Sequence, residues 1–184
     1  MNLPNKITVL RVCLIPIFLV VFLIEPFGVM VSAWVAVLVF SIAAITDAID
    51  GHLARKYKLI TNFGKLMDPL ADKLLVCSAF VAFAATGLLP AWAVILLISR
   101  EFYISGLRQL ALEQRIVVAA SNLGKFKTIT QIVLTIYVLL PPPLTFFVFD
   151  IVIFVLVIIT VIFSIVSAVD YTIKNKQLFT AKEF

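Results

Sequence analysis

The sequence predicts an all-α membrane protein with six transmembrane helices and both termini in the cytoplasm. Of its 184 residues, 63% are hydrophobic and only 14% are charged, whereas a soluble domain has about 45–50% apolar and about 25% charged residues. A protein this small cannot bury such an excess in a core, because much of its surface remains exposed. Disordered chains are excluded as well, since they have low hydrophobicity. The basic residues also gather on one side of the predicted membrane, which orients the helices.

Apolar runs bounded by turn residues or charges predict the first three spans, because a helix that crosses a bilayer needs about 20 mostly apolar residues. The first run, at 7–24, ends at a turn that contains Pro and Gly, and Arg11 near its start can extend its charge to the membrane surface. The second run lies at 29–46. A polar connection at 51–67 leads to the third span, at 68–86.

Breaks in the apolar pattern also delimit the last three spans. The fourth, at 91–112, follows a segment that ends in Pro90. The fifth, at 125–140, stops at three consecutive prolines, which cannot continue a helix. The sixth, at 145–169, is followed by a polar tail. These spans fill nearly the whole chain, so we expect a single domain over residues 1–184.

The basic residues set the expected orientation. The turns near 25–28, 87–90 and 141–144 contain no Lys or Arg, and all 15 basic residues fall toward the other side. Lys and Arg concentrate on the cytoplasmic side of membrane proteins, and an even number of spans returns both termini to that side. We therefore expect a multi-pass protein of the cell membrane. Cys13 and Cys77 fall inside spans, where we expect small core residues and no disulfide.

Four of the ten acidic residues form two closely spaced pairs, Asp47 with Asp50 and Asp68 with Asp72. Residues three or four apart share a helix face, and the second and third spans adjoin at the cytoplasmic interface. Four carboxylates this close must pair with bases, take up protons or bind cations. Hard oxygen ligands suit Mg²⁺ or Mn²⁺, and two such ions are usual for phosphoryl displacement. The alternative is a set of ordinary helix-end carboxylates in contact with water and lysines.

The residues around these aspartates match a known signature. Residues 47–72 follow the pattern D-x2-D-G-x2-A-R-x8-G-x3-D-x3-D, which resembles in full that of the CDP-alcohol phosphotransferases. The segment 3–11 is similar to the opening PN-x-[LI]-T-x2-R of several bacterial members. The resemblance implies six membrane helices, a homodimer and an active site at the cytoplasmic face.

The resemblance also implies a reaction and roles for individual residues. A CDP-linked lipid, typically CDP-diacylglycerol, gives its phosphatidyl group to an alcohol, and CMP leaves. Asp47, Asp50 and Asp68 correspond to metal ligands, whereas Asp72 corresponds to the general base and to a further metal contact. The positions implied to bind the CDP-linked lipid are Asn5, Thr8, Gly51, Ala54, Arg55 and Gly64.

Two further segments concern the alcohol acceptor. Residues 99–108 and 118–128 closely resemble family members whose acceptor is sn-glycerol 3-phosphate, a dianion. The cations implied for its phosphate are Arg100, Arg108, Lys125 and Lys127. The two arginines fall inside the fourth predicted span, where a charge is costly and usually functional. The alternatives are a structural pair, such as Arg100 with Glu101, or contact with lipid headgroups.

Other functions stay open on the sequence. Within the family, the acceptor would instead be serine, an inositol phosphate or phosphatidylglycerol. A transporter or channel also uses intramembrane carboxylates, but transporter sites usually lie near the midplane between repeats, and no repeat is visible here. A structural scaffold leaves the four aspartates unexplained. The expected partners are CDP-diacylglycerol, sn-glycerol 3-phosphate, membrane lipids and a second copy of the chain, with no nucleic acid.

Overall fold

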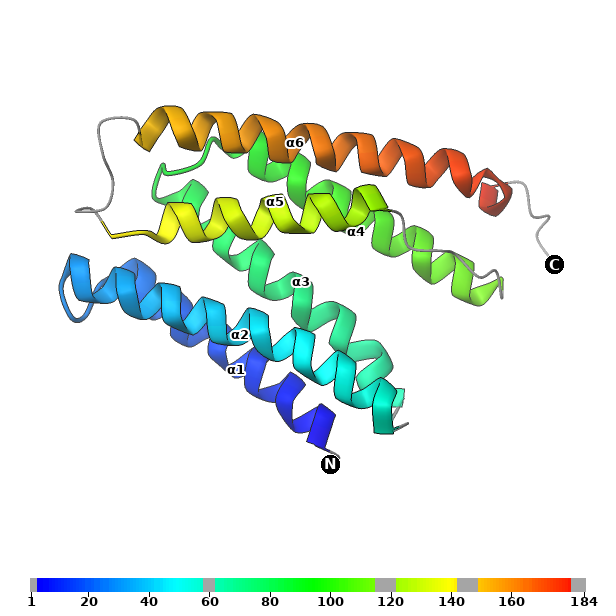
Figure 1. The fold of residues 1–184 in the computed structure, drawn as a ribbon, viewed down its shortest axis with the longest axis horizontal. Helices are drawn as coiled ribbons and strands as arrows, with labels where there is room; N and C mark the ends of the chain where they lie inside the picture. Colours follow the sequence, from blue (N-terminus) through cyan, green and yellow to red (C-terminus); the bar gives the residue numbers. More distant parts are fainter. Residues whose placement is uncertain (1–2, 58–61, 115–121, 142–148, 180–184) are drawn as a thin grey trace. The chain divides into compact units, whose positions relative to one another are not determined.

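Helices make up the described structure, a computed structural model of the chain (Figure 1). The backbone is described for residues 3–57, 62–114, 122–141 and 149–179. Side chains are described from residue 9 onward, apart from those of residues 47–69, 72, 115–122, 142–148 and 179–184. The elements are α1 (Leu3–Ile24), α2 (Val29–Tyr57), α3 (Asn62–Ala85), α4 (Ala91–Glu113), α5 (Asn122–Leu139), α6 (Phe149–Lys174) and the 3₁₀-helix η2 (Lys176–Phe179). No strand occurs in these ranges, which confirms the all-α prediction for this part of the chain.

The largest departure from the predicted elements is at the polar connection. The sequence predicts a connection at 51–67, but α2 continues to Tyr57 and α3 begins at Asn62. Arg, Lys and Leu favour a helix almost equally, so a fall in hydropathy shows where a helix leaves an apolar layer and not where it ends. The prediction of a long connection is therefore wrong, and only residues 58–61 separate the two helices.

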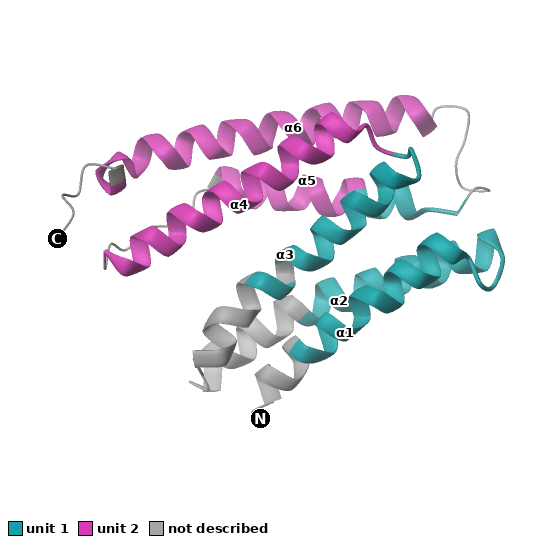
Figure 2. Ribbon diagram, turned by 180° about the vertical axis from the view of Figure 1, so that it is seen from behind, with its two compact units in different colours: residues 1–88, 135–147 teal, residues 89–134, 148–184 magenta. Residues whose placement is uncertain are grey.

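The chain divides into two compact units, and unit 1 comprises residues 1–88 and 135–147 (Figure 2). Within it, helices α1, α2 and α3 pack against one another in all three pairings. Aromatic rings join these helices: Phe22 of α1 meets Phe83 of α3 edge-on with ring centroids 5.3 Å apart, and Phe18 of α1 lies 5.9 Å from Phe40 of α2. Such pairs stabilise a structure by about 0.5–1.5 kcal/mol each, so these rings hold the three helices of unit 1 together.

Glycines form the turns that end α1 and α3, as the sequence predicts. Gly28 has a φ of 81° and Gly87 a φ of 75°, a left-handed conformation that favours glycine. The N–H of Leu88 donates to the carbonyl of Phe83 at 2.9 Å, and the N–H of Gly87 donates to that of Ala84 at 3.1 Å. This pair of bonds is the Schellman arrangement, which satisfies carbonyl groups at a helix end.

Unit 2 comprises residues 89–134 and 148–184. Helix α6 packs against α4, and the buried side chains of Ile104, Leu107 and Tyr171 form a core cluster between them. The 3₁₀-helix η2 also contacts α4. Helix α4 therefore contacts both of the described elements that end the chain, α6 and η2.

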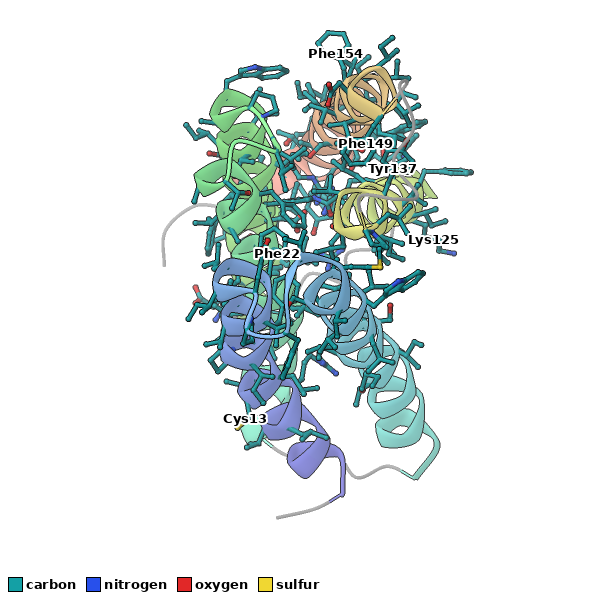
Figure 3. The ribbon with its side chains drawn as sticks, turned by 90° about the vertical axis from the view of Figure 1, so that its left-hand side faces the viewer. Cys13, Phe22, Lys125, Tyr137, Phe149 and Phe154 are labelled. Atoms are coloured by element: carbon teal, nitrogen blue, oxygen red, sulfur yellow. The ribbon has the colours of Figure 1, made fainter. Side chains whose placement is uncertain are left out.

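Large apolar side chains also cover the outside of the helices. The segment Val29–Thr46 of α2 and the whole of α6 are long and apolar enough to cross a membrane, with mean hydropathies of 2.4 and 3.2. On α6, Phe154 is 62% exposed and points away from the helices in Figure 3. Exposed apolar surface of this kind is typical of contact with lipid or with a partner protein.

Two sequence-based expectations about α1 are wrong. Arg11 is fully buried and does not extend to a membrane surface, because it lies on the side of α1 that packs within unit 1. Cys13 is exposed, not part of a core, and Cys77 is partly buried. A helix that is apolar on all sides has no polar face to show which side is inward, so the sequence does not predict which side of α1 is buried.

Candidate functional site

The four aspartates of the predicted metal site lie on two helices of unit 1 that contact each other. Asp47 and Asp50 belong to the C-terminal part of α2. Asp68 and Asp72 belong to the N-terminal half of α3. Residues three or four apart share a helix face, so each pair lies on one side of its helix. Their side chains are outside the described part of the structure.

The donor chemistry of these positions fits a hard divalent cation. Carboxylate oxygens are the ligands that Mg²⁺ and Mn²⁺ prefer, and two contacting helices supply four carboxylates. Among the residues whose side chains are described, no group of three or more His, Cys, Asp or Glu could hold a metal ion. The four aspartates are not among those residues, so their metal binding stays a prediction.

The residues predicted to bind the CDP-linked lipid also belong to unit 1. They are distributed over three helices, with Asn5 and Thr8 on α1, Gly51, Ala54 and Arg55 on α2, and Gly64 on α3. Because these helices pack in all pairings, the backbone gathers all six positions and the aspartates into one unit. The side chains of the six lie outside the described residues, so their roles also stay predictions.

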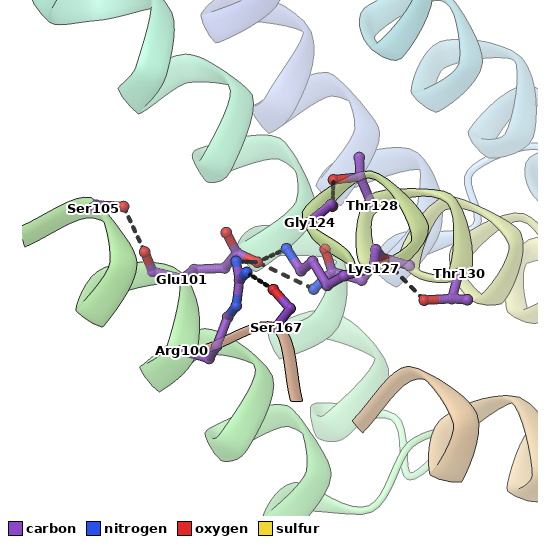
Figure 4. Close-up of polar contacts among 9 residues, drawn as sticks. Arg100, Glu101, Ser105, Gly124, Lys127, Thr128, Thr130 and Ser167 are labelled. Carbon is purple, nitrogen blue, oxygen red and sulfur yellow. Dashed lines mark hydrogen bonds and ion pairs between the residues drawn. The ribbon is translucent and has the colours of Figure 1, made fainter. Parts of the chain in front are cut away.

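A second polar group lies in unit 2, where the carboxylate of Glu101 gathers donors from two helices (Figure 4). From α5, Lys127 Nζ forms an ion pair with Glu101 Oε1, and Gln131 Nε2 donates to the same oxygen at 3.4 Å. From α4, Arg100 Nη1 lies 3.7 Å from it. Arg100 Nη2 donates to Ser167 Oγ on α6. These five residues are called the Glu101 cluster below.

The Glu101 cluster is buried and carries a net positive charge. The exposed fractions of its charged side chains are 12% for Arg100, 13% for Glu101 and 5% for Lys127. Burial of charge is costly unless the groups are paired and hydrogen-bonded, and the single carboxylate of Glu101 lies beside both cations. Arg100 Nε has no hydrogen-bond partner among the described residues. The cluster therefore offers charge and a donor group to an anion.

Helical spacing explains how the cluster forms. Lys127 and Gln131 are four residues apart on α5 and share a face, so both reach the same carboxylate. Arg100 and Glu101 are consecutive on α4, and consecutive side chains diverge by about 100° around a helix. Glu101 consequently contacts α5 while Arg100 reaches Ser167 on α6.

The other two predicted acceptor cations lie apart from the cluster. The guanidinium carbon of Arg108 is 6.0 Å from the centre of the Tyr171 ring, and its side chain is exposed. Arg108 comes eight residues after Arg100, which is about 12 Å along a helix. Lys125 is exposed and points away from the helices in Figure 3, because residues two apart do not face the same side. Of the four predicted acceptor cations, the structure thus brings only Arg100 and Lys127 to the same carboxylate.

Three members of the cluster are missing from the predicted site. Glu101 is expected on the sequence only as a structural partner of Arg100, a contact that the structure contains. Its position inside a predicted apolar span is a signal, since such acids are costly there. Gln131 has a weaker signal in its spacing from Lys127. Ser167 has none, because small residues are common between membrane helices.

Comparisons with known proteins agree with the aspartate signature. The family model of CDP-alcohol phosphatidyltransferase matches residues 1–166. The chain is 44% identical over 188 residues to the CDP-diacylglycerol–glycerol-3-phosphate 3-phosphatidyltransferase of Bacillus subtilis (strain 168), covering 95% of both chains. Proteins of the same name from Rickettsia bellii (strain RML369-C) and Salmonella paratyphi A (strain ATCC 9150 / SARB42) are 40% and 44% identical, over 71% and 77% of this chain and 70% and 78% of theirs. This chain therefore belongs to the CDP-alcohol phosphatidyltransferase family, as its signature predicts, and is an enzyme.

Proposed function

We propose that this enzyme transfers a phosphatidyl group from CDP-diacylglycerol to sn-glycerol 3-phosphate, giving phosphatidylglycerophosphate and CMP. The observation that carries this proposal is the similarity to relatives named for that reaction, which reaches 44% identity over 95% of both chains. The buried Arg100 and Lys127 of the Glu101 cluster support a phosphorylated acceptor, because guanidinium and ammonium groups bind phosphate through charge-assisted hydrogen bonds. Membership of an enzyme family leaves the transporter and scaffold alternatives without support.

The proposed arrangement is a multi-pass protein with six spans and both termini and the active site at the cytoplasmic face. A lipid donor requires a site that is reached from the bilayer, and the apolar outer surfaces of α2 and α6 support a membrane location. The one-sided distribution of basic residues supports the orientation. A homodimer, implied by the family resemblance, belongs to the same proposal.

In the proposed mechanism, the aspartates of α2 and α3 hold two divalent cations, Mg²⁺ or Mn²⁺. Such ions neutralise a pyrophosphate and stabilise charge that develops on the leaving group. Asp47, Asp50 and Asp68 act as ligands. Asp72 accepts the proton of the attacking hydroxyl, as a general base does, and also contacts a metal. The positions that bind the CDP-linked lipid are Asn5, Thr8, Gly51, Ala54, Arg55 and Gly64.

The bond changes follow from these roles. The acceptor oxygen forms a bond to the phosphorus that carries the diacylglycerol. The bond from that phosphorus to the bridging oxygen of the pyrophosphate breaks, and CMP leaves with the electron pair. Arg100 and Lys127 bind the phosphate of sn-glycerol 3-phosphate, since guanidinium and ammonium groups bind phosphate through charge-assisted hydrogen bonds. Arg108 and Lys125 attract the same anion from exposed positions.

The acceptor profile tests the proposed function. Purified protein is supplied with CDP-diacylglycerol and Mg²⁺, and CMP release is measured with each acceptor in turn. We expect release with sn-glycerol 3-phosphate and none with serine, inositol phosphate or phosphatidylglycerol. Release with one of these three and not with sn-glycerol 3-phosphate would overturn the proposal.

A further inference from the structure

We propose that Glu101 is a positioning residue of the acceptor site, whose buried carboxylate holds Arg100 and Lys127 together as a pair of phosphate-binding cations. This inference rests on the proposed function, in which those two cations bind sn-glycerol 3-phosphate. Glu101 itself does not touch the substrate, because its negative charge would repel a phosphate.

The charges explain why such a residue is needed. Two cations that bind one phosphate must lie close together, and like charges repel strongly in a medium of low dielectric constant. When the phosphate is absent, that repulsion would drive the more flexible Lys127 side chain away from Arg100. The Glu101 carboxylate contacts both: it forms an ion pair with Lys127 and lies 3.7 Å from Arg100 Nη1.

Further contacts hold the Glu101 carboxylate and the Arg100 guanidinium in place. Gln131 Nε2 donates to Glu101 Oε1 at 3.4 Å, so that oxygen is held from α5 by two groups one helical turn apart. Arg100 Nη2 is bound to Ser167 on α6. The carboxylate therefore sets the separation of two cations that come from different helices.

The arrangement differs from an ordinary structural ion pair. A pair that only offsets the cost of burial needs one cation for each carboxylate, whereas here one carboxylate has two. Arg100 Nε, on one of these two cations, is buried and has no hydrogen-bond partner among the described side chains. Two buried cations and this unpaired donor point to an anion as a further partner of the cluster.

The first test replaces the carboxylate by an amide of the same shape. In Glu101→Gln the full-length enzyme keeps its reaction chemistry but loses the charge that holds Lys127. We expect the KM for sn-glycerol 3-phosphate to rise by about tenfold or more, as loss of a charge-assisted bond implies, while the KM for CDP-diacylglycerol is unchanged. Glu101→Asp keeps the charge on a shorter side chain and should restore part of the affinity.

A double-mutant cycle tests whether Glu101 acts through Lys127. Lys127→Met should raise the KM for sn-glycerol 3-phosphate, and Glu101→Gln added to it should have little further effect, because the residue to be positioned is gone. This double variant has the same net charge as the wild type, so it can be measured even if Glu101→Gln alone does not fold. Asp170→Asn is the matched control, since its carboxylate pairs with Lys174 at 2.8 Å outside the cluster. Neither KM should change in that control.

The results separate this inference from the proposed function. The positioning role would be overturned if Glu101→Gln left the KM for sn-glycerol 3-phosphate unchanged or lowered it, or if it changed the KM for both substrates equally. It would also be overturned if the effects of Glu101→Gln and Lys127→Met on that KM multiplied fully in the double variant. If Lys127→Met also leaves that KM unchanged, the assignment of the cluster to the acceptor is wrong. If Lys127→Met raises it and Glu101→Gln does not, only the positioning role fails.

Discussion

The hydrogen bond from Arg100 on α4 to Ser167 on α6 should make a measurable contribution to acceptor binding. In Ser167→Ala, Arg100 Nη2 loses its acceptor, and Nε has none among the described residues. Two donors of one buried guanidinium would then lack partners. A hydrogen bond to a charged group contributes about 1.5–3 kcal/mol, and because Arg100 retains 12% exposure, we expect the lower end of that range. About 1.5 kcal/mol corresponds to a rise of about tenfold in the KM for sn-glycerol 3-phosphate.

The assay measures CMP release from purified enzyme in detergent, with saturating CDP-diacylglycerol and increasing sn-glycerol 3-phosphate. Ser164→Ala is the matched control, because Ser164 lies on the same helix, is 2% exposed, and its hydroxyl has no hydrogen-bond partner among the described residues. Loss of an unpaired buried hydroxyl should leave activity unchanged and stability equal or slightly higher. Equal effects of the two substitutions, or an unchanged KM in Ser167→Ala, would refute the reasoning.

Three further predictions concern the metal site, the core and the turns. Asp68→Asn should lower the rate of CMP release by at least about a hundredfold, because mutation of a group that only orients a metal ligand already lowers metal affinity or activity by about 10–100-fold. Chelation of the metal should abolish wild-type activity, and added Mg²⁺ should restore it. Phe83→Ala, at a position fully buried in unit 1, should lower the free energy of unfolding in mixed micelles by up to about 3–5 kcal/mol, whereas Phe154→Ala, at an exposed position, should change it by less than about 0.5 kcal/mol. Gly87→Ala should lower the free energy of unfolding by about 1–2 kcal/mol, because Gly87 has a left-handed backbone. Gly106→Ala, inside α4, should raise it by up to about 1 kcal/mol, because the new methyl group would meet no atom within 4 Å.

The helices were predictable because their signals are local. Pro and Gly end α1 and α3 close to the expected residues, and Gly87 takes the left-handed conformation that a helix end favours. Hydropathy, in contrast, reports the surroundings of a helix and not its length, which is why the polar extension of α2 to Tyr57 was not predicted. The burial of Arg11 depends on which side of an evenly apolar helix meets α2 and α3, and that is a property of the tertiary packing.

The candidate site likewise has a part that local sequence signals predict and a part that depends on tertiary packing. The aspartate pairs were predictable because each pair lies within one helix, so its spacing alone sets a shared face. The Glu101 cluster joins residues from three helices that are far apart in sequence, and no local pattern connects Lys127 with Glu101. For that reason the sequence proposes four acceptor cations, whereas the packing of α4, α5 and α6 selects Arg100 and Lys127 as the pair that meets.

The Glu101 cluster has a consequence for how this enzyme is made. Within the proposed spans, α4 contains Arg100 and Glu101 and α5 contains Lys127, and a single Arg, Lys or Asp at the centre of a spanning helix opposes insertion by about 2.5–3.5 kcal/mol. In the proposed topology, Lys127 emerges from the ribosome after Glu101, and Ser167 emerges later still. The translocation machinery would then have to retain α4 until α5 and α6 arrive, so these three helices should enter the bilayer as one group.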